Sequence, residues 1–192
     1  MKKYEFTGVE KAQGGVILHQ IRAVRDFGSA RAGDVGGWVE SGRNLSHDGN
    51  AWVYGDAMVY SDAMVYGDAR VCGDALVYGD AWVCGDARVY GDARVCGGVW
   101  DRSPCFIQGT RWSMNVSSPD TVRCGCQDHT WKEWRDRYAE ISERHNAGDV
   151  LGEYIQYFNL LCKRYGHEDC VIGQEEIAHA GTEGEARHAE EN

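Results

Sequence analysis

Three residues in the C-terminal half could bind a metal ion. Cys124, Cys126 and His129 follow one another closely, and thiolate and imidazole groups are ligands that zinc prefers in proteins. Cys105 could supply a fourth ligand. The spacing Cys-x-Cys-x-x-His is tighter than that of the usual zinc finger and lacks a clear second pair. The alternative is that Cys124 packs in a core while His129 caps a helix, so we expect no obligatory cofactor and keep zinc as an alternative.

A second candidate site comes from a repeat of six residues that runs from Gly49 to Cys96 and most often reads Gly-Asp-Ala-x-Val followed by Tyr or Cys. Ala and Val are two positions apart and share one face of an extended strand, so the residues that follow each of them point outward. Outward arginines beside tyrosines could hold a phosphate-bearing ligand through bidentate and stacking contacts. Alternatively, these arginines pair with the aspartates of the repeat. The residues of this candidate ligand or partner surface are Tyr54, Tyr60, Tyr66, Tyr78, Tyr90, Arg70, Arg88 and Arg94.

Large apolar side chains at other outward positions predict an interface between subunits. Exposed apolar patches of this size usually mark an interaction surface, although ladders of like residues can also support a sheet by packing on one another. We expect a homo-oligomer whose subunit contacts are made by Trp52, Met58, Met64, Leu76 and Trp82.

The repeat predicts a parallel β-helix. A strand that turns every six residues makes short sides, and three such sides close a triangular coil of about eighteen residues. The inward Ala and Val residues then form the core. The same phase extends upstream, where Val35 falls in register with Val53, so the chain from Val35 to Cys96 makes about three and a half coils. The expected fold class is mainly β, a parallel β-helix with a small α+β C-terminal cap.

The chain beyond the repeat predicts short strands and then helices. Phe106–Gln108, 112–116 and 121–124 read as strands. Thr130 and Glu133 form a capping box before one helix, and a second helix begins near Asp149 and stops at Gly166. We therefore divide the chain into an N-terminal strand or capping segment (1–32), the β-helix (33–98), a β-hairpin (99–128), a two-helix cap (129–166) and an acidic tail that we expect to be mobile (167–192).

Charge is distributed unevenly along the chain. The formal net charge is −10, and residues 166–192 carry −7 of it. The remaining residues have no excess of positive charge that would attract nucleic acid or an anionic membrane. No apolar run follows the basic start, so we expect no signal peptide or membrane anchor and a cytoplasmic location. Of the eight cysteines, three replace Tyr in the repeat, and we expect reduced thiols.

The repeat resembles the left-handed β-helix superfamily of hexapeptide-repeat proteins. The stretches Leu18–Ala23, Ala32–Glu40 and Asn44–Ser46 look most like phage and enterobacterial prophage proteins of that fold, and residues 125–134 match them more loosely. Left-handed coiling is taken from this resemblance, since ordinary parallel crossovers are right-handed. The resemblance also implies a threefold assembly, so a trimer is favoured, and a location in the host cytoplasm. Such proteins are often labelled transferases, which bears on this chain only by analogy.

Two function classes follow from the resemblance. Acyltransferases of the superfamily use a histidine as general base, and its carbonic anhydrases bind zinc through three histidines, whereas this repeat holds no histidine after His47. We therefore predict a non-catalytic, phage-type binding protein on an oligomeric β-helix. A counter-defence role is plausible for it, such as inhibition of a host immune protein or sequestration of a nucleotide-like signal. The alternative is an acyl- or other group-transferase in which His47 acts as the base.

Overall fold

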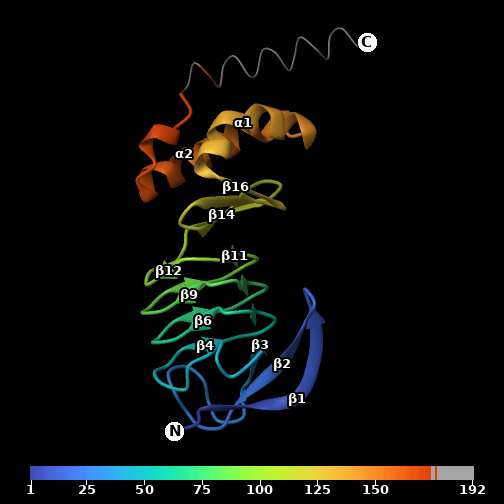
Figure 1. Cartoon of the computed structure of the whole chain (residues 1–192), viewed down its shortest axis with the longest axis vertical. Coiled ribbons are helices and arrows are strands. Elements are labelled where there is room, and N and C mark those ends of the chain that lie inside the picture. The colour runs from blue at the N-terminus through green and yellow to red at the C-terminus, as the bar shows by residue number, and fades with distance from the viewer. Residues whose placement is uncertain (174–175, 177–192) are drawn as a thin grey trace. The chain divides into compact units, whose positions relative to one another are not determined.

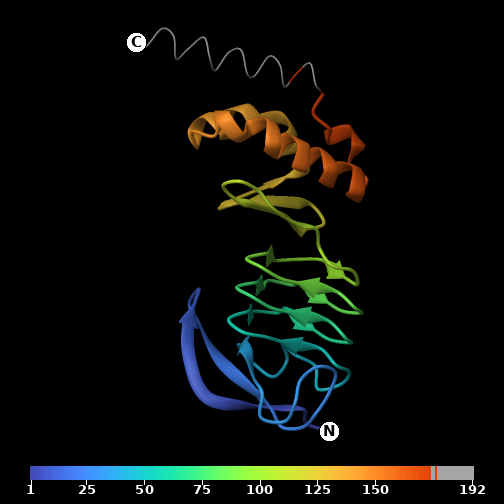
Figure 2. The same cartoon turned by 180° about the vertical axis from the view of Figure 1, so that it is seen from behind.

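The computed structural model describes residues 1–173 and 176 and divides the chain into two compact units (Figures 1 and 2). The first, here the solenoid unit, comprises Met1–Phe106 and Asn115–Pro119. The second, here the helical unit, comprises Ile107–Met114 and Asp120–Asn192. Each unit is described by itself.

The solenoid unit stacks short parallel strands in three walls, which confirms the expected class, a mainly β, parallel β-helix with a small helical region after it. Each hexad supplies a two-residue strand at its x-Val positions, and the solenoid makes about four turns. One wall has the strand order β3-β5-β8-β11, the second β4-β7-β10 and the third β6-β9-β12. The strands are β3 Val35–Val39, β4 Trp52–Val53, β5 Met58–Val59, β6 Met64–Val65, β7 Arg70–Val71, β8 Leu76–Val77, β9 Trp82–Val83, β10 Arg88–Val89, β11 Arg94–Val95 and β12 Val99–Trp100.

The inward Ala and Val residues fill the solenoid, as the repeat predicts. Every Ala from Ala51 to Ala93 and every Val from Val53 to Val95 within the repeat is at most 1% exposed. Backbone amides of one coil donate to carbonyls of the next, as Trp52 N does to Ala69 O at 3.0 Å. Most corners of the repeat hold glycine at a positive φ. The corner at Gly79 requires it, because φ is +63° there and a Cβ would lie 2.2 Å from the Cys96 carbonyl oxygen.

The first turn is longer than the later ones, so the predicted register of Val35 with Val53 is wrong. Trp38 pairs with Met58, whereas Met58 pairs with Leu76 one ordinary coil further on. Val35 instead pairs antiparallel with Arg22.

The side chain of Asn44 stabilises the longer first turn through hydrogen bonds. The Asn44 amide donates to the carbonyl oxygens of Ser61 and Ala63, both at 2.9 Å, and so replaces backbone contacts that an ordinary hexad would make. Its Oδ1 accepts from the Ser41 backbone amide at 2.8 Å.

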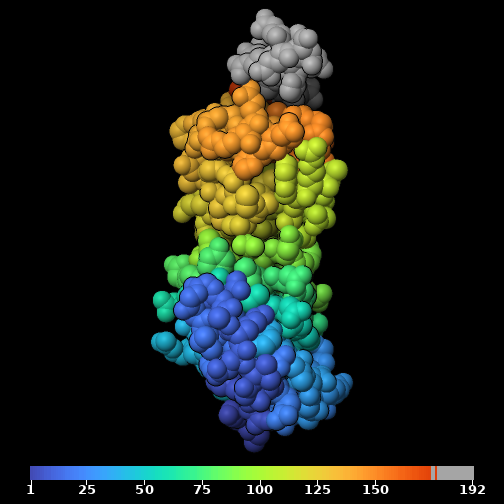
Figure 3. All heavy atoms as spheres, turned by 90° about the vertical axis from the view of Figure 1, so that its right-hand side faces the viewer, coloured from blue at the N-terminus to red at the C-terminus, as the bar shows by residue number. Residues whose placement is uncertain are grey.

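An N-terminal hairpin of β1 (Tyr4–Gln13) and β2 (Val16–Ala23) extends the first wall, because β2 pairs antiparallel with β3. Figure 3 shows this hairpin in blue, lying across the coils. Just before it, the fully buried Lys3 donates from Nζ to Ala51 O at 2.8 Å. Burial, aided by Arg25, lowers the pKa of Lys3 to about 8. The Tyr4 hydroxyl donates to Leu45 O at 2.9 Å.

Two further strands run along the chain from one unit into the other: β13 Phe106–Gln108 and β14 Ser113–Ser118. Within the helical unit, β15 (Thr121–Cys124) and β16 (Gln127–Thr130) form an antiparallel hairpin. Across it, Arg123 forms an ion pair with Asp128 at 3.3 Å. The sequence predicted strands at the positions of β13, β14 and β15 but none at β16.

Two helices complete the helical unit. The predicted capping box is confirmed, because Thr130 is the N-cap of α1 (Trp131–Arg144) and exchanges hydrogen bonds with Glu133. A short 3₁₀ turn, η1 (Gly148–Val150), leads into α2 (Leu151–Tyr165), which stops at Gly166 with a φ of +79°, as predicted. A second 3₁₀ turn, η2, covers Glu168–Cys170.

The predicted mobile tail at 167–192 lies mostly outside the described residues. Within the described part of the chain, no helix is long and apolar enough to cross a membrane.

Candidate functional site

Two arginines of the candidate ligand surface lie side by side on one wall of the solenoid. Arg70 in β7 pairs directly with Arg88 in β10, and both occupy the outward position of their hexads. They line a shallow hollow together with Gly28, Asn50, Asp68 and Asp86. Arg88 is further fixed through its backbone amide, which donates to Ser103 Oγ at 2.9 Å.

The two arginines of this hollow form no ion pair with a described residue, although Asp68 and Asp86 line the same hollow. Among the described residues, no ion pair within 4.0 Å includes Arg70 or Arg88. The alternative of pairing with the repeat's aspartates is therefore not observed for these two arginines. Asp68 instead accepts a hydrogen bond from Asn50 Nδ2 at 2.7 Å. Like charges on neighbouring strands repel, so a bound anion would relieve the repulsion between the two guanidinium groups.

The other members of the candidate surface lie apart from this pair. Arg94 belongs to β11 and to a different wall. Tyr60 stacks on Tyr78 with ring centroids 5.4 Å apart, which confirms that ladder. The rings of the remaining tyrosines contact other residues: Tyr54 packs against Trp52, Tyr66 against Trp82 and Tyr90 against Phe106. The structure therefore brings only Arg70 and Arg88 together as a charged site.

Two of the five predicted subunit contacts are wrong, because the chain buries them itself. Trp52 is 1% exposed and Leu76 6%. The Trp52 indole and the Phe27 ring form a T-shaped pair with centroids 5.2 Å apart, and a Cβ at Gly36 would lie 2.6 Å from that indole. Aromatic residues of the N-terminal segment thus occupy the place beside Trp52 that we expected a second subunit to fill.

Two other predicted contacts remain exposed on the third wall. Met64 pairs with Trp82, and Trp82 pairs with Val99. These three side chains are 36%, 45% and 65% exposed, respectively, and we call them the apolar stripe. Met58, the fifth predicted contact, is half-buried on the first wall.

The structure does not assemble the predicted zinc ligands. In the β15–β16 hairpin, Cys124 lies opposite Gln127 and His129 opposite Val122. Within the described ranges, no three His, Cys, Asp or Glu side chains form a metal-binding group. Burial raises the pKa of the Cys124 thiol to about 12, so the thiolate that zinc requires is disfavoured. The cap of the following helix is Thr130 rather than His129.

His47 packs against Lys3 and Tyr4 at the start of the solenoid. Its Nδ1 accepts a hydrogen bond from the Lys3 backbone amide at 3.4 Å, and its ring lies 4.3 Å from the Tyr4 ring. Burial first, and then the charge of Lys3, lower the pKa of His47. These contacts orient the imidazole toward the N-terminal segment.

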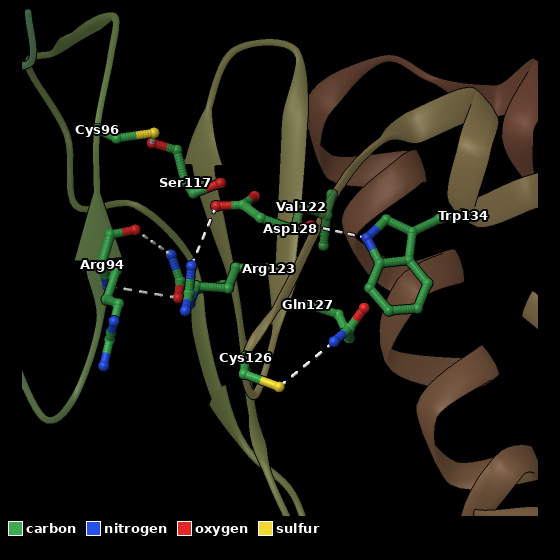
Figure 4. Close-up of polar contacts among 10 residues, drawn as sticks. Arg94, Cys96, Ser117, Val122, Arg123, Cys126, Gln127, Asp128 and Trp134 are labelled. Carbon is green, nitrogen blue, oxygen red and sulfur yellow. Dashed lines mark hydrogen bonds and ion pairs between the residues drawn. The ribbon is translucent and has the colours of Figure 1, made fainter. Parts of the chain in front are cut away.

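The helical unit contains an apolar cavity that the sequence did not reveal. It lies among β15, the turn after it and both helices, and it has a volume of about 80 Å³. Figure 4 shows two contacts that frame it: Trp134 donates from Nε1 to Val122 O at 2.7 Å, and Gln127 donates to Cys126 Sγ at 3.4 Å. Its lining residues come from five separate segments, so no local pattern predicts it.

Comparison with known proteins places the similarity in the coils. A family model described as the YdcK β-solenoid repeat matches residues 69–85 and 87–103. A protein of Escherichia coli K12, called uncharacterized acetyltransferase YdcK, is 34% identical over 62 residues, which cover 28% of this chain and 19% of that protein. The matched region therefore spans about a fifth of the length of this relative. The six-residue repeat, the stacked parallel strands and these matches together identify the chain as a hexapeptide-repeat β-helix protein.

Proposed function

We propose that the chain is a non-catalytic binding protein whose solenoid wall holds an anionic, phosphate-bearing ligand between Arg70 and Arg88. The observation that carries this proposal is the direct pairing of the two arginines in an open hollow, where neither forms an ion pair with a described carboxylate. Guanidinium groups bind phosphate oxygens through paired hydrogen bonds.

The hollow also selects among anions. Asp68 and Asp86 line it and repel a negative charge, so a ligand must place its phosphate on the arginines and its neutral part elsewhere. The side-chain amide of Asn50 donates a hydrogen bond to Asp68. A nucleotide-like ligand has this division between a phosphate and an uncharged base and sugar.

A calorimetric titration tests the proposal with adenosine monophosphate and inorganic phosphate as probes. The double variant Arg70→Ala/Arg88→Ala should weaken nucleotide binding by tenfold or more, since a hydrogen bond to a charged group contributes about 1.5–3 kcal/mol. Arg94→Ala is the matched control, because it removes the same residue type from the same repeat position on another wall. If the wild type does not bind either probe, or if Arg94→Ala weakens binding as much as the double variant, the proposal is wrong.

The resemblance to phage and prophage proteins supports a counter-defence role for such a site in the host cytoplasm, through sequestration of a nucleotide signal or binding of a host immune protein. Mass spectrometry of small molecules released from protein purified out of infected cells should detect a phosphorylated compound that is missing from the double variant. A preparation without any such compound, and without a co-purified host protein, argues against this role.

We also propose that the chain forms a homo-oligomer, with a trimer favoured, through the apolar stripe of Met64, Trp82 and Val99. An exposed apolar patch on a flat sheet wall commonly marks an interface. Trp82→Glu should dissociate the assembly in sedimentation experiments because it would bury a carboxylate, whereas Tyr90→Glu, at another exposed aromatic residue, should not. A wild-type chain that sediments as a monomer would refute this part.

The second candidate function is group transfer, and it is favoured by the name of the Escherichia coli relative. The contacts of His47 with Lys3 and Tyr4 argue against it. Acetyl-CoA turnover that is lost in His47→Ala would establish the transferase, while the absence of acetyl-CoA binding would exclude this version of it.

A further inference from the structure

We propose that the cavity of the helical unit is a binding site for a small neutral ligand with an apolar body and one hydrogen-bonding oxygen. The site is separate from the arginine pair and independent of the function proposed for it. Its apolar lining includes Met114 from β14, Ile141 from α1 and Ile155 and Phe158 from α2.

Ser142 gives this cavity its polar anchor. Ser142 is one of the lining residues and is only 6% exposed. Its Oγ is buried and has no hydrogen-bond partner in the described part of the chain. Buried hydroxyls in native proteins are almost always paired, so an exception calls for an explanation. Because Oγ is fully enclosed in this structure, a ligand oxygen supplies one when the serine side chain turns its hydroxyl toward the cavity.

The other buried polar groups around the cavity are already engaged. The Tyr154 hydroxyl accepts from the backbone amides of Arg111 and Trp112, at 3.0 and 2.6 Å, and donates to Trp112 O at 2.9 Å. Trp134 Nε1 donates to Val122 O. Among the buried side chains of the lining, Ser142 therefore remains as the group that a ligand can bind, and the half-buried His145 is a further polar residue of the lining.

The lining also sets the charge of the ligand. No Asp, Glu, Lys or Arg lines the cavity, and His145 is the one histidine in its lining. Burial raises the pKa of Cys124 to about 12, so its thiol is neutral at physiological pH. An ionised ligand would lose its hydration without gaining a counter-charge, which favours a neutral molecule.

The volume of the cavity and the position of its opening further restrict which ligands fit. The cavity volume of about 80 Å³ is roughly half of the ~150 Å³ that accommodates benzene in an apolar protein cavity. A short unbranched alcohol or ketone fits this limit. Cys126 lines the cavity and is exposed, so the turn between β15 and β16 forms its mouth.

Nuclear magnetic resonance of the full chain tests this site with butan-1-ol as the probe. We expect saturable shifts of the amide signals of residues 142, 145 and 155. Ser142→Ala should weaken binding about fivefold, the equivalent of one neutral hydrogen bond, whereas Ser142→Thr, which keeps the hydroxyl, should bind within about twofold of the wild type. Shifts that rise linearly up to the solubility limit, or equal affinities of the wild type and Ser142→Ala, would overturn the proposal.

A second measurement follows the mouth of the site. Butan-1-ol should slow the alkylation of Cys126 by iodoacetamide in the wild type, and it should do so less in Ser142→Ala. Cys72, in the solenoid unit, is the internal reference and should react at an unchanged rate. If the probe protects neither thiol or both thiols equally, no ligand occupies this cavity.

Discussion

The unpaired hydroxyl of Ser142 predicts that its removal stabilises the protein. Most substitutions in a core destabilise, so the direction alone is diagnostic. A buried hydroxyl without a partner costs about 1–3 kcal/mol relative to an apolar group of similar shape. Ser142 also lies inside α1, where alanine is favoured over serine by about 0.5 kcal/mol. Ser142→Ala should therefore raise the free energy of unfolding by about 1.5–3 kcal/mol, less a small loss of packing.

Thermal unfolding of the ligand-free full chain, followed by circular dichroism at 222 nm and by calorimetry, measures this change. For a protein of this size, each kcal/mol shifts Tm by about 2–4 °C, so the helical transition should move up by roughly 3–12 °C. Gln156→Ala is the control, because Gln156 is exposed in the middle of α2 and reports on helix propensity alone. It should change Tm by less than about 1–2 °C.

A lower or unchanged Tm of Ser142→Ala would refute the reasoning, because it would mean that the hydroxyl has a partner in the ligand-free protein. Butan-1-ol provides a further check. When it is present at saturation, the wild type should recover part of the difference from Ser142→Ala, since the ligand supplies the missing hydrogen bond.

Three further predictions concern the solenoid unit. The pKa of Lys3 is lowered from 10.5 to about 8 in the folded chain, so between these pH values the unfolded chain binds the proton more tightly. The stability of the wild type relative to Lys3→Met should therefore rise as the pH increases from 8 to 10.5. Urea titrations at pH 8 and pH 10.5 measure this difference in stability, and a difference that does not change with pH contradicts the prediction. Gly79→Ala should cost at least about 1–3 kcal/mol because of its positive φ and the nearby Cys96 carbonyl, while Gly148→Ala, with free space at its Cβ, should cost little in the same urea assay. Asn44→Ala should cost about 1–3 kcal/mol by leaving the Ala63 carbonyl unsatisfied, and equal stability of variant and wild type in urea would show that water replaces the amide.

Periodic parts of this molecule were predictable from the sequence. Each Ala and Val of the repeat faces the core because the six-residue period fixes its orientation in every coil, and the stacking of Tyr60 on Tyr78 follows from the same period. The ends of α1 and α2 were also predictable, since Thr130 with Glu133 and Gly166 act locally.

Contacts between distant segments were not predictable in the same way. Trp52 occupies an outward position of its hexad, and only the fold shows that Phe27 and Tyr4 cover it. The consecutive Gly36 and Gly37 were the one local signal, because a Cβ at Gly36 would overlap with that indole. The cavity beside Ser142 is formed by tertiary packing between separate segments. The pattern of apolar residues along one helix does not predict such packing.

The position of Lys3 bears on how this protein avoids growing into fibres. Each coil offers its carbonyls to amides of the preceding coil, as Ala69 O does to Trp52 N, so the first coil presents acceptors that another chain could use as a template. Lys3 Nζ donates a hydrogen bond to Ala51 O, and the Tyr4 hydroxyl donates one to Leu45 O. Two side chains thereby occupy acceptors that a further coil would use, and we expect them to disfavour end-to-end association at this end of the solenoid.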